Sequence, residues 1–415
     1  MNMTKIGIVA RKVYRIFKNR GFAGVMQKLD EVSVVKNDVI GFYNFVMDVE
    51  EIPFNKQEYE EMKDGPITLN WVIPEMGVGS GGHINIFRFI NLLQQRGIKN
   101  RIYIFKGNNL DTNEKLREFL KEHYDIVNDG IEIYSDVSYM KFAHGTVATS
   151  WITAYYVRKF NNTVSKFYFV QDFEPYFYAV GSEYMFAENT YRFGFRGITA
   201  GDWLKDKLRD EYGMKTHSFG FSYDRDLYTK KDKRDQVKRL FFYARPVTAR
   251  RAFELGLLAL AEIAKRIPDV EVVFAGWDVS NYEIPFKHLN AGSVKLEDLA
   301  DLYAQCDMCL VLSNTNLSLL PLEVMASNSV AVCTKGANSD WLVNEENSIM
   351  VDFDPIMIAD KIEYYFKNPE KLATIREKGM EFAQKTSWEQ EADKVYAAVL
   401  EGIKEDEEEN INHWW

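Results

Sequence analysis

Two arginines, five positions apart, follow an apolar run in the second half of the chain, where they could bind a diphosphate. Arg245 lies just beyond the run Leu240–Tyr243, and Arg250 lies near the start of the next predicted helix. Planar guanidinium groups make bidentate, charge-assisted hydrogen bonds with phosphate oxygens. Two positive charges here would also stabilise a departing nucleotide diphosphate. Solvation of both arginines at the surface is the alternative that this pattern leaves open.

Three carboxylates occupy comparable positions after predicted strands. Glu323 is in the first turns of a helix that follows the run Met308–Leu312, where it could accept hydrogen bonds from two sugar hydroxyls. Asp172 and Glu174 come directly after the run Phe167–Val170, and either could orient or deprotonate an acceptor hydroxyl. The alternatives are a helix-dipole interaction for Glu323 and a turn cap for Asp172.

A glycine-rich loop, Pro74–His83, separates a predicted strand from a predicted helix. Its residues Gly79, Ser80, Gly81 and Gly82 let the backbone approach a ligand closely, and the amide groups at the start of the next helix favour an anion. An ordinary tight turn would also explain the glycines.

Two other kinds of site are less compatible with the sequence. A nicotinamide-dependent oxidoreductase would place an acidic residue after the second strand to hold a ribose, but that strand ends in Phe105, Lys106 and Gly107. Cys306 and Cys309 form a C-x-x-C beside an apolar run, without a second cysteine pair or a nearby histidine. We therefore expect buried thiols instead of a zinc or redox site. We also expect no metal in the reaction, because the two arginines could neutralise the diphosphate.

Length and charge limit the function further. The chain has 415 residues, 46% of them hydrophobic, and a formal net charge of −10, so we expect two to three folded domains and no nucleic-acid partner. Residues 1–28 carry seven basic and no acidic side chains with helical periodicity. Such a helix could lie on an anionic membrane surface or pack on its own domain. With no apolar stretch of membrane-spanning length and no signal peptide, we expect a cytoplasmic protein, peripheral on the inner face of the cell membrane if the helix binds lipid.

From Gly65 onward, short apolar runs alternate with amphipathic segments, which indicates parallel sheets wrapped by helices. A polar stretch, Tyr228–Lys238, interrupts this alternation and is interpreted as a linker. The prediction is an α/β protein with two doubly wound, Rossmann-like domains facing a cleft: a helical extension over 1–64, a first domain over 65–234 and a second over 235–387. The predicted strands are Thr68–Ile73, Arg101–Phe105, Thr146–Thr149, Phe167–Val170, Gly197–Ala200, Leu240–Tyr243, Val270–Ala275, Met308–Leu312, Val330–Cys333 and Ile349–Val351.

These motifs together resemble the nucleotide-sugar glycosyltransferases of GT-B fold, in the large retaining group often called family 4. The resemblance covers roughly residues 67 to 390 and includes R-x4-R where the family has R-x4-K. Longer strings are similar to the rhamnosyltransferases that build rhamnose-containing surface glycans, such as those of bacterial S-layers. These strings are Tyr168–Pro175, Gly181–Tyr184, Ala187–Tyr191 and the pair Arg245-Pro246.

The resemblance implies a donor, dTDP-L-rhamnose, held mainly by the second domain, and an acceptor that is a growing surface polysaccharide or glycan, lipid-linked in some cases. Arg245 and Arg250 would contact the diphosphate, and Glu323 the nucleotide ribose. The main-chain amides around Leu319–Leu320 would lie near phosphate, and the loop Gly79–Gly82 would close over the reaction centre. A last helix beginning near 388 would cross back to the first domain, bringing 388–415 with it.

One position departs from the family pattern. The family has a second glutamate eight residues before the one that binds ribose, and here that position is Thr315. Because threonine carries no charge, electrostatic help toward the sugar is weakened or comes from elsewhere. This substitution keeps a second class of function open, a non-catalytic scaffold that binds nucleotide sugars.

Overall fold

The computed structural model describes most of the chain, apart from the basic N-terminal segment and a few short stretches. The described residues are 38–78, 80–105, 112–124, 126 and 130–410. They divide into two units, one ending at Asp48 and one beginning at Val49. The first consists of helix α2 (Val39–Tyr43), capped by the Asp38 side chain, and the short helix η1 (Asn44–Val46). The predicted membrane-binding helix in 1–28 lies outside the described residues.

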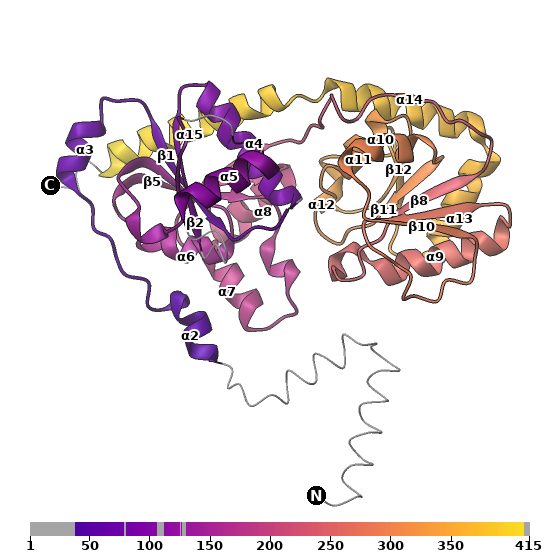
Figure 1. Ribbon diagram of the computed structural model, residues 1–415, viewed down its shortest axis with the longest axis horizontal. Helices are drawn as coiled ribbons and strands as arrows, with labels where there is room; N and C mark the ends of the chain where they lie inside the picture. Colours follow the sequence, from indigo (N-terminus) through magenta and orange to yellow (C-terminus); the bar gives the residue numbers. More distant parts are fainter. Residues whose placement is uncertain (1–37, 79, 106–111, 125, 127–129, 411–415) are drawn as a thin grey trace, which may run out of the picture. The chain divides into compact units, whose positions relative to one another are not determined.

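The second unit contains two parallel β-sheets, as predicted from the alternating apolar runs (Figure 1). The first sheet has the order β3-β2-β1-β4-β5-β6-β7, so the direction of winding reverses between β1 and β4. The strands are β1 (Thr68–Pro74), β2 (Lys99–Phe105), β3 (Glu132–Tyr134), β4 (Ala143–Ala148), β5 (Thr163–Val170), β6 (Arg196–Ala200) and β7 (Thr216–Phe219). Their crossover helices are α4 (Gly81–Gln95), α5 (Asn113–Tyr124), η2 (Val137–Tyr139), α6 (Trp151–Lys159), η3 (Glu174–Phe177), α7 (Ser182–Thr190) and α8 (Asp202–Tyr212).

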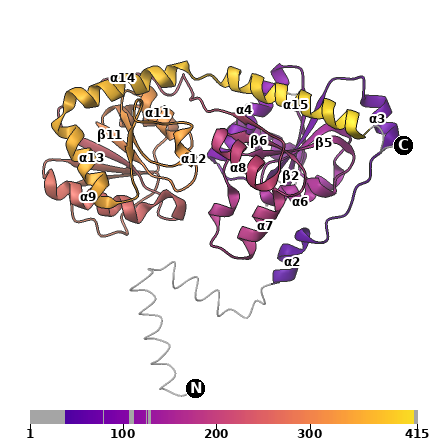
Figure 2. The same ribbon diagram turned by 180° about the vertical axis from the view of Figure 1, so that it is seen from behind.

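The second sheet has the order β10-β9-β8-β11-β12-β13, with the same reversal between β8 and β11. The strands are β8 (Arg239–Tyr243), β9 (Glu271–Ala275), β10 (His288–Gly292), β11 (Met308–Val311), β12 (Val330–Thr334) and β13 (Ile349–Val351). The helices are η4 (Ala249–Arg251), α9 (Phe253–Arg266), α10 (Leu296–Ala304), α11 (Leu320–Ala326), α12 (Ala337–Asp340), α13 (Pro355–Lys367) and α14 (Pro369–Lys385). Helices α9 and α13 cover one side of this sheet, and α10 and α11 the other (Figure 1). Helix α14 contributes buried side chains to the cores on both sides (Figure 2).

Burial explains which strands the sequence predicts. In β1 and β11 nearly every residue is buried, because central strands of a parallel sheet are covered on both faces, and they read as continuous apolar runs. The sequence interpretation misses β3, β7 and β10, which are edge strands with few apolar side chains.

The final helix, α15 (Trp388–Asn410), returns to the first sheet and lies along it in both views (Figures 1 and 2). Its Asp406 carboxylate accepts a hydrogen bond of 2.7 Å from Ser165 and pairs with Arg196 at 2.5 Å. The segment from 49 to 64, which the sequence groups with the N-terminal extension, also contacts this domain. Ile52 forms a β-bridge with Phe160, and α3 (Lys56–Met62) packs nearby.

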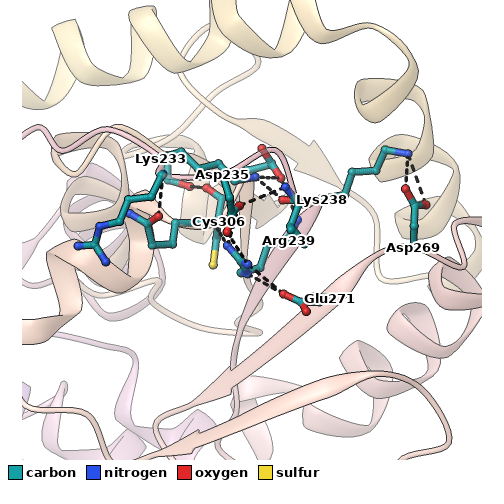
Figure 3. A network of polar contacts seen from close by, with 12 residues as sticks. Lys233, Asp235, Lys238, Arg239, Asp269, Glu271 and Cys306 are labelled. Atoms are coloured by element: carbon teal, nitrogen blue, oxygen red, sulfur yellow. Dashed lines mark hydrogen bonds and ion pairs between the residues drawn. The ribbon is translucent and has the colours of Figure 1, made fainter.

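The polar connection between the domains is held by ion pairs to the second domain (Figure 3). Lys233 pairs with Asp307 at 2.6 Å, and Asp235 pairs with Arg239 at 3.1 Å. Arg239 also bonds Glu271 at 3.0 Å on the neighbouring strand. These contacts fix the connection where it enters β8, so that β8 presents its carboxyl end at a defined place.

Candidate functional site

A cavity of about 300 Å³ lies where the reversal points of the two sheets face each other. From the first domain it is lined by the loop after β1, the start of α6 and the loop after β5. From the second domain it is lined by the loops after β8 and β11. Ligands of open α/β sheets bind at the carboxyl ends of the strands, at such reversal points. The cavity is therefore the candidate site.

The glycine-rich loop forms one wall of the cavity. Ser80, Gly81 and Gly82 line it, as the sequence predicts for a ligand-facing loop, and Gly79 lies outside the described residues. Helix α4 begins at Gly81, and the side chain of its N-cap residue Ser80 does not bond the first amides, so the N-terminus of the helix can receive an anion. His83 also lines the wall, with its Nδ1 2.7 Å from the Ser80 hydroxyl. Burial lowers the pKa of His83, which keeps its ring neutral.

Asp172 bridges the two domains. One of its carboxylate oxygens accepts a 2.8 Å hydrogen bond from the Phe173 amide, and the other accepts one of 2.7 Å from the Thr315 hydroxyl. The same oxygen lies 3.7 Å from Nε of Arg250. Burial raises the pKa of Asp172, and the bond from Thr315 opposes that rise. A carboxylate from the first domain thus stands against the threonine that replaces the family's glutamate.

Glu174 is buried behind Asp172 and also lines the cavity. Its carboxylate accepts hydrogen bonds of 2.6 Å from the Tyr168 hydroxyl and 2.8 Å from the Trp151 amide. The Trp151 amide is the first of helix α6, so Glu174 caps that helix. Burial raises the pKa of Glu174 to about 7, a value suited to exchanging a proton with a hydroxyl group.

Arg250 projects into the cavity from η4 at the end of the loop after β8. Its guanidinium lies 4.8 Å from the ring centroid of Phe177 in the first domain. Its Nε is buried and makes no hydrogen bond with the described residues. The main-chain carbonyl of Arg250 accepts a 2.8 Å hydrogen bond from the Asn314 amide, which joins the loop after β8 to the loop after β11.

Arg251, which the sequence interpretation does not select, lies beside Arg250 on the same wall. It is only 7% exposed, and its Nη1 is buried without a hydrogen bond to any described residue. The next residue, Ala252, has φ +47°, in the left-handed region that alanine avoids. The chain is thus held in a strained turn where it presents the two arginines, as is common at binding sites.

The structure does not bring every predicted residue to the cavity. Arg245 is absent from the lining, and its Nη1 donates a 3.2 Å hydrogen bond to the carbonyl of Gly276, with Trp277 6.0 Å away. Glu323 is also outside the lining, and it accepts a hydrogen bond from the Tyr228 hydroxyl. Burial raises the pKa of Glu323 to about 7.

The loop after β11 reaches the cavity through residues that precede the predicted ones. Asn316 and Ser318 line it. Leu319 and Leu320, at the start of α11, are not among the lining residues. Asn316 donates a 2.8 Å hydrogen bond to the carbonyl of Gln171, a second link between the domains. The sequence signal that could have selected this loop is its run of polar residues between a buried strand and a helix.

The cysteines are buried and unpaired, which confirms the expectation of core thiols. Burial raises the pKa of Cys309 to about 12, so its thiolate does not form at neutral pH. Within the described ranges, no three His, Cys, Asp or Glu side chains are grouped to hold a metal ion. None of the helices in that part of the chain is both long and apolar enough to cross a bilayer.

Comparison with known proteins agrees with this geometry. Residues 238–363 match the family described as the C-terminal domain of WsaF. Sucrose-phosphate synthase of Thermosynechococcus elongatus is similar in structure, with a TM-score of 0.61 and 14% identity over 80% of this chain and 98% of that one. HepE of Anabaena, solved with UDP and glucose, has a TM-score of 0.59 and 14% identity over 80% and 99% of the two chains. The second unit therefore has the GT-B fold of these structures, two Rossmann-like domains with parallel sheets.

A relative in sequence is the O-antigen biosynthesis protein RfbC of Myxococcus xanthus. It is 31% identical over 343 residues, which make up 80% of this chain and 27% of RfbC. The GT-B chain described here therefore corresponds to only part of that longer protein. The match of 238–363 to the WsaF domain covers β8 to β13 and includes both cavity arginines.

Proposed function

We propose that the protein is a glycosyltransferase that moves a sugar from a nucleotide donor onto a growing bacterial surface polysaccharide. The observation that carries this proposal is the cavity. It is lined by two arginines of the second domain, each with a buried nitrogen that makes no hydrogen bond with the described residues, and by the start of α4 and two carboxylates of the first domain. The match to the WsaF domain and the similarity to an O-antigen biosynthesis protein support the polymer as the end product.

The arrangement can perform the chemistry of sugar transfer. The bond between the anomeric carbon and the diphosphate oxygen breaks, and its electron pair leaves with the nucleoside diphosphate. Arg250 and the first amides of α4 would stabilise that charge. An acceptor hydroxyl forms the new bond to the anomeric carbon and gives up its proton, for which Glu174 is the candidate base because its pKa is raised to about 7.

Asp172 supplies negative charge near the reacting sugar in this proposal. Because it accepts hydrogen bonds from Thr315 and Phe173, its carboxylate is fixed in orientation, and a fixed charge can stabilise positive charge that develops at the anomeric carbon. Asp172 would then provide the electrostatic help that Thr315 cannot. Retention of anomeric configuration is the outcome that the family resemblance implies.

The donor that we propose is dTDP-L-rhamnose. The strings that resemble rhamnosyltransferases support this choice, since one of them, Tyr168–Pro175, borders the cavity. Asp172, Glu174 and Phe177 in and beside Tyr168–Pro175 line it. A uridine donor is the competing possibility, because the structurally similar HepE was solved with UDP and glucose.

Ligand binding and turnover test this proposal together. Calorimetric titration and thermal denaturation of the full chain would be compared with dTDP-L-rhamnose, UDP-glucose and NADH. A donor present at 100 times its dissociation constant should stabilise the fold by roughly 2.7 kcal/mol. Release of dTDP in the presence of a glycan acceptor should follow. Binding without release, over a broad acceptor panel that includes lipid-linked glycans, would favour a scaffold, and tight binding of NADH alone would favour an oxidoreductase.

We also propose that the basic segment 1–28 attaches the enzyme to the cytoplasmic face of the membrane, where a lipid-linked acceptor would be found. Seven basic side chains, each worth about 1 kcal/mol near anionic headgroups, support this role. Deleting residues 1–30 should reduce cosedimentation with phosphatidylglycerol vesicles and leave activity on a soluble acceptor unchanged. Equal cosedimentation of both forms would contradict the proposal.

A further inference from the structure

Arg251 differs from the other buried arginines of the described residues in forming no ion pair with any of them. Three arginines are buried in the described part of the chain, Arg101, Arg196 and Arg251, with exposures of 8%, 5% and 7%. Arg196 is paired with Asp406 at 2.5 Å, and Arg101 with Glu132 at 3.3 Å. No ion pair joins Arg251 to any described carboxylate, and its Nη1 makes no hydrogen bond with these residues.

The surroundings of Arg251 do not compensate its charge. Its guanidinium lies 5.6 Å from the ring centroid of Tyr243, a weak cation–π contact, and Arg250 and Arg245 add positive charge nearby. The nearby carboxylate, Asp172, already accepts hydrogen bonds from Thr315 and Phe173. Burial, with a smaller contribution from the charge of Arg250, lowers the pKa of Arg251 to about 10. A buried cation left in this state is stabilised by an anion that enters from the cavity.

The two adjacent arginines offer more than a single phosphate group would use. Nε of Arg250 and Nη1 of Arg251 make no hydrogen bond with the described residues, and both side chains line the same cavity. Nε of Arg250 has only a long contact of 3.7 Å with the Asp172 carboxylate. Each guanidinium can bind two phosphate oxygens in its plane. A pair of linked phosphates can satisfy both groups at once, whereas one phosphate would leave one of them underused.

We propose that Arg251 is the second guanidinium of the diphosphate site and that, with Arg250, it makes the protein select nucleoside diphosphates over monophosphates. This inference depends on the proposed function, because it assumes that the cavity receives a nucleotide donor. Arg251 would then contact the diphosphate in place of Arg245, the residue that the R-x4-R motif puts there.

Calorimetric titration of the full chain with dTDP and with dTMP tests the inference. In Arg251→Gln, affinity for dTDP should fall at least tenfold, while affinity for dTMP should change less than threefold. Arg251→Lys should keep part of the dTDP affinity, because it restores the charge without the planar fork. The matched control is Arg234→Gln, which removes a 69% exposed arginine from the surface and should change neither affinity.

The possible results separate this inference from the proposed function. If the wild-type protein binds dTDP and Arg251→Gln binds it equally well, the inference is wrong and the proposed function stands. Equal losses for dTDP and dTMP would contradict the selection of diphosphates. If the wild-type protein binds UDP instead, the same comparison is made with UDP and UMP. If it binds no nucleotide at all, both proposals fail. Urea denaturation shows whether each variant is folded. If Arg251→Gln is not folded, Arg251→Met is used in its place.

Discussion

The two walls of the cavity differ in how their charged groups are satisfied. On the first-domain side, Asp172 and Glu174 each accept two or more hydrogen bonds from the protein. On the second-domain side, Arg250 and Arg251 each keep a buried nitrogen that makes no hydrogen bond with the described residues, although Nε of Arg250 lies 3.7 Å from the Asp172 carboxylate. Side chains that already make hydrogen bonds within the protein are held in a fixed orientation. A buried donor without a hydrogen bond is unfavourable in the free protein, so a ligand that bonds to it gains binding free energy. The first-domain wall therefore holds its carboxylates in fixed positions, and the second-domain wall offers hydrogen-bond donors to an anionic ligand.

The largest effect should come from placing the family's glutamate in the second domain, directly against the Asp172 carboxylate of the first-domain wall. Thr315→Glu would put a second carboxylate beside Asp172 at a position that is only 1% exposed. Like charges in a buried site, together with the added volume, should destabilise the fold by about 3 kcal/mol. Urea denaturation at pH 7 measures this change.

Two further variants test the cause of that destabilisation. Thr315→Ser keeps the hydroxyl that bonds Asp172 and should unfold almost like the wild type. The double variant Thr315→Glu with Asp172→Ser should recover part of the loss, because only one carboxylate remains. A Thr315→Glu protein as stable as the wild type would show that a second carboxylate beside Asp172 is tolerated, which contradicts the prediction.

A smaller effect should come from removing one arginine from the second-domain wall. Arg250→Ala should weaken dTDP binding by about 2 kcal/mol, as expected for losing a charge-assisted pair. Arg245→Ala should cost less, because Arg245 bonds the carbonyl of Gly276 and does not line the cavity. Calorimetric titration of both variants measures the difference. An equal or greater loss for Arg245→Ala would place that residue at the diphosphate, as the family motif implies.

The smallest effect concerns the pH dependence of stability. The pKa of Glu174 is raised from its ordinary 4.5 to about 7, so the folded protein binds a proton that the unfolded chain releases between these values. Stability from this group is therefore present at low pH and is lost as pH rises from about 5 to 7. The free energy of unfolding should fall by about 1 to 2 kcal/mol more over this range in the wild type than in Glu174→Gln.

Urea denaturation at a series of pH values provides the measurement. The surface variant Glu381→Gln is the matched control and should keep the slope of the wild type. A Glu174→Gln slope identical to that of the wild type would show that Glu174 is ionised in the folded protein throughout this range.

The sequence predicts the central strands and both domains well, because parallel strands buried on both faces must be apolar along their whole length. It misses β3 and β10 because an edge strand in contact with solvent needs no such run. The site was predicted as separate residues. The bond between Asp172 and Thr315 joins positions 143 apart, and only the packing of one domain against the other brings them together.

Arg251 shows a different limit of sequence reasoning. Two consecutive arginines look like a solvated pair, and nothing in their composition separates the one that is 7% exposed from its neighbour. Arg251 is followed by a turn at Ala252, whose left-handed conformation is not encoded by a glycine or asparagine. A doubled arginine after a buried strand is the signal that could have selected it.

The return of α15 to the first sheet has a consequence for synthesis of the chain. Its side chains Ala392, Val395 and Val399 are completely or almost completely buried, in the same core as β5 and β7. When β7 has been synthesised, α15, which completes the core of the first domain, has therefore not yet been made. Until about 180 more residues have been synthesised, the apolar face of the first domain that α15 covers stays exposed. The second domain is contiguous in sequence and can fold before α15 is made.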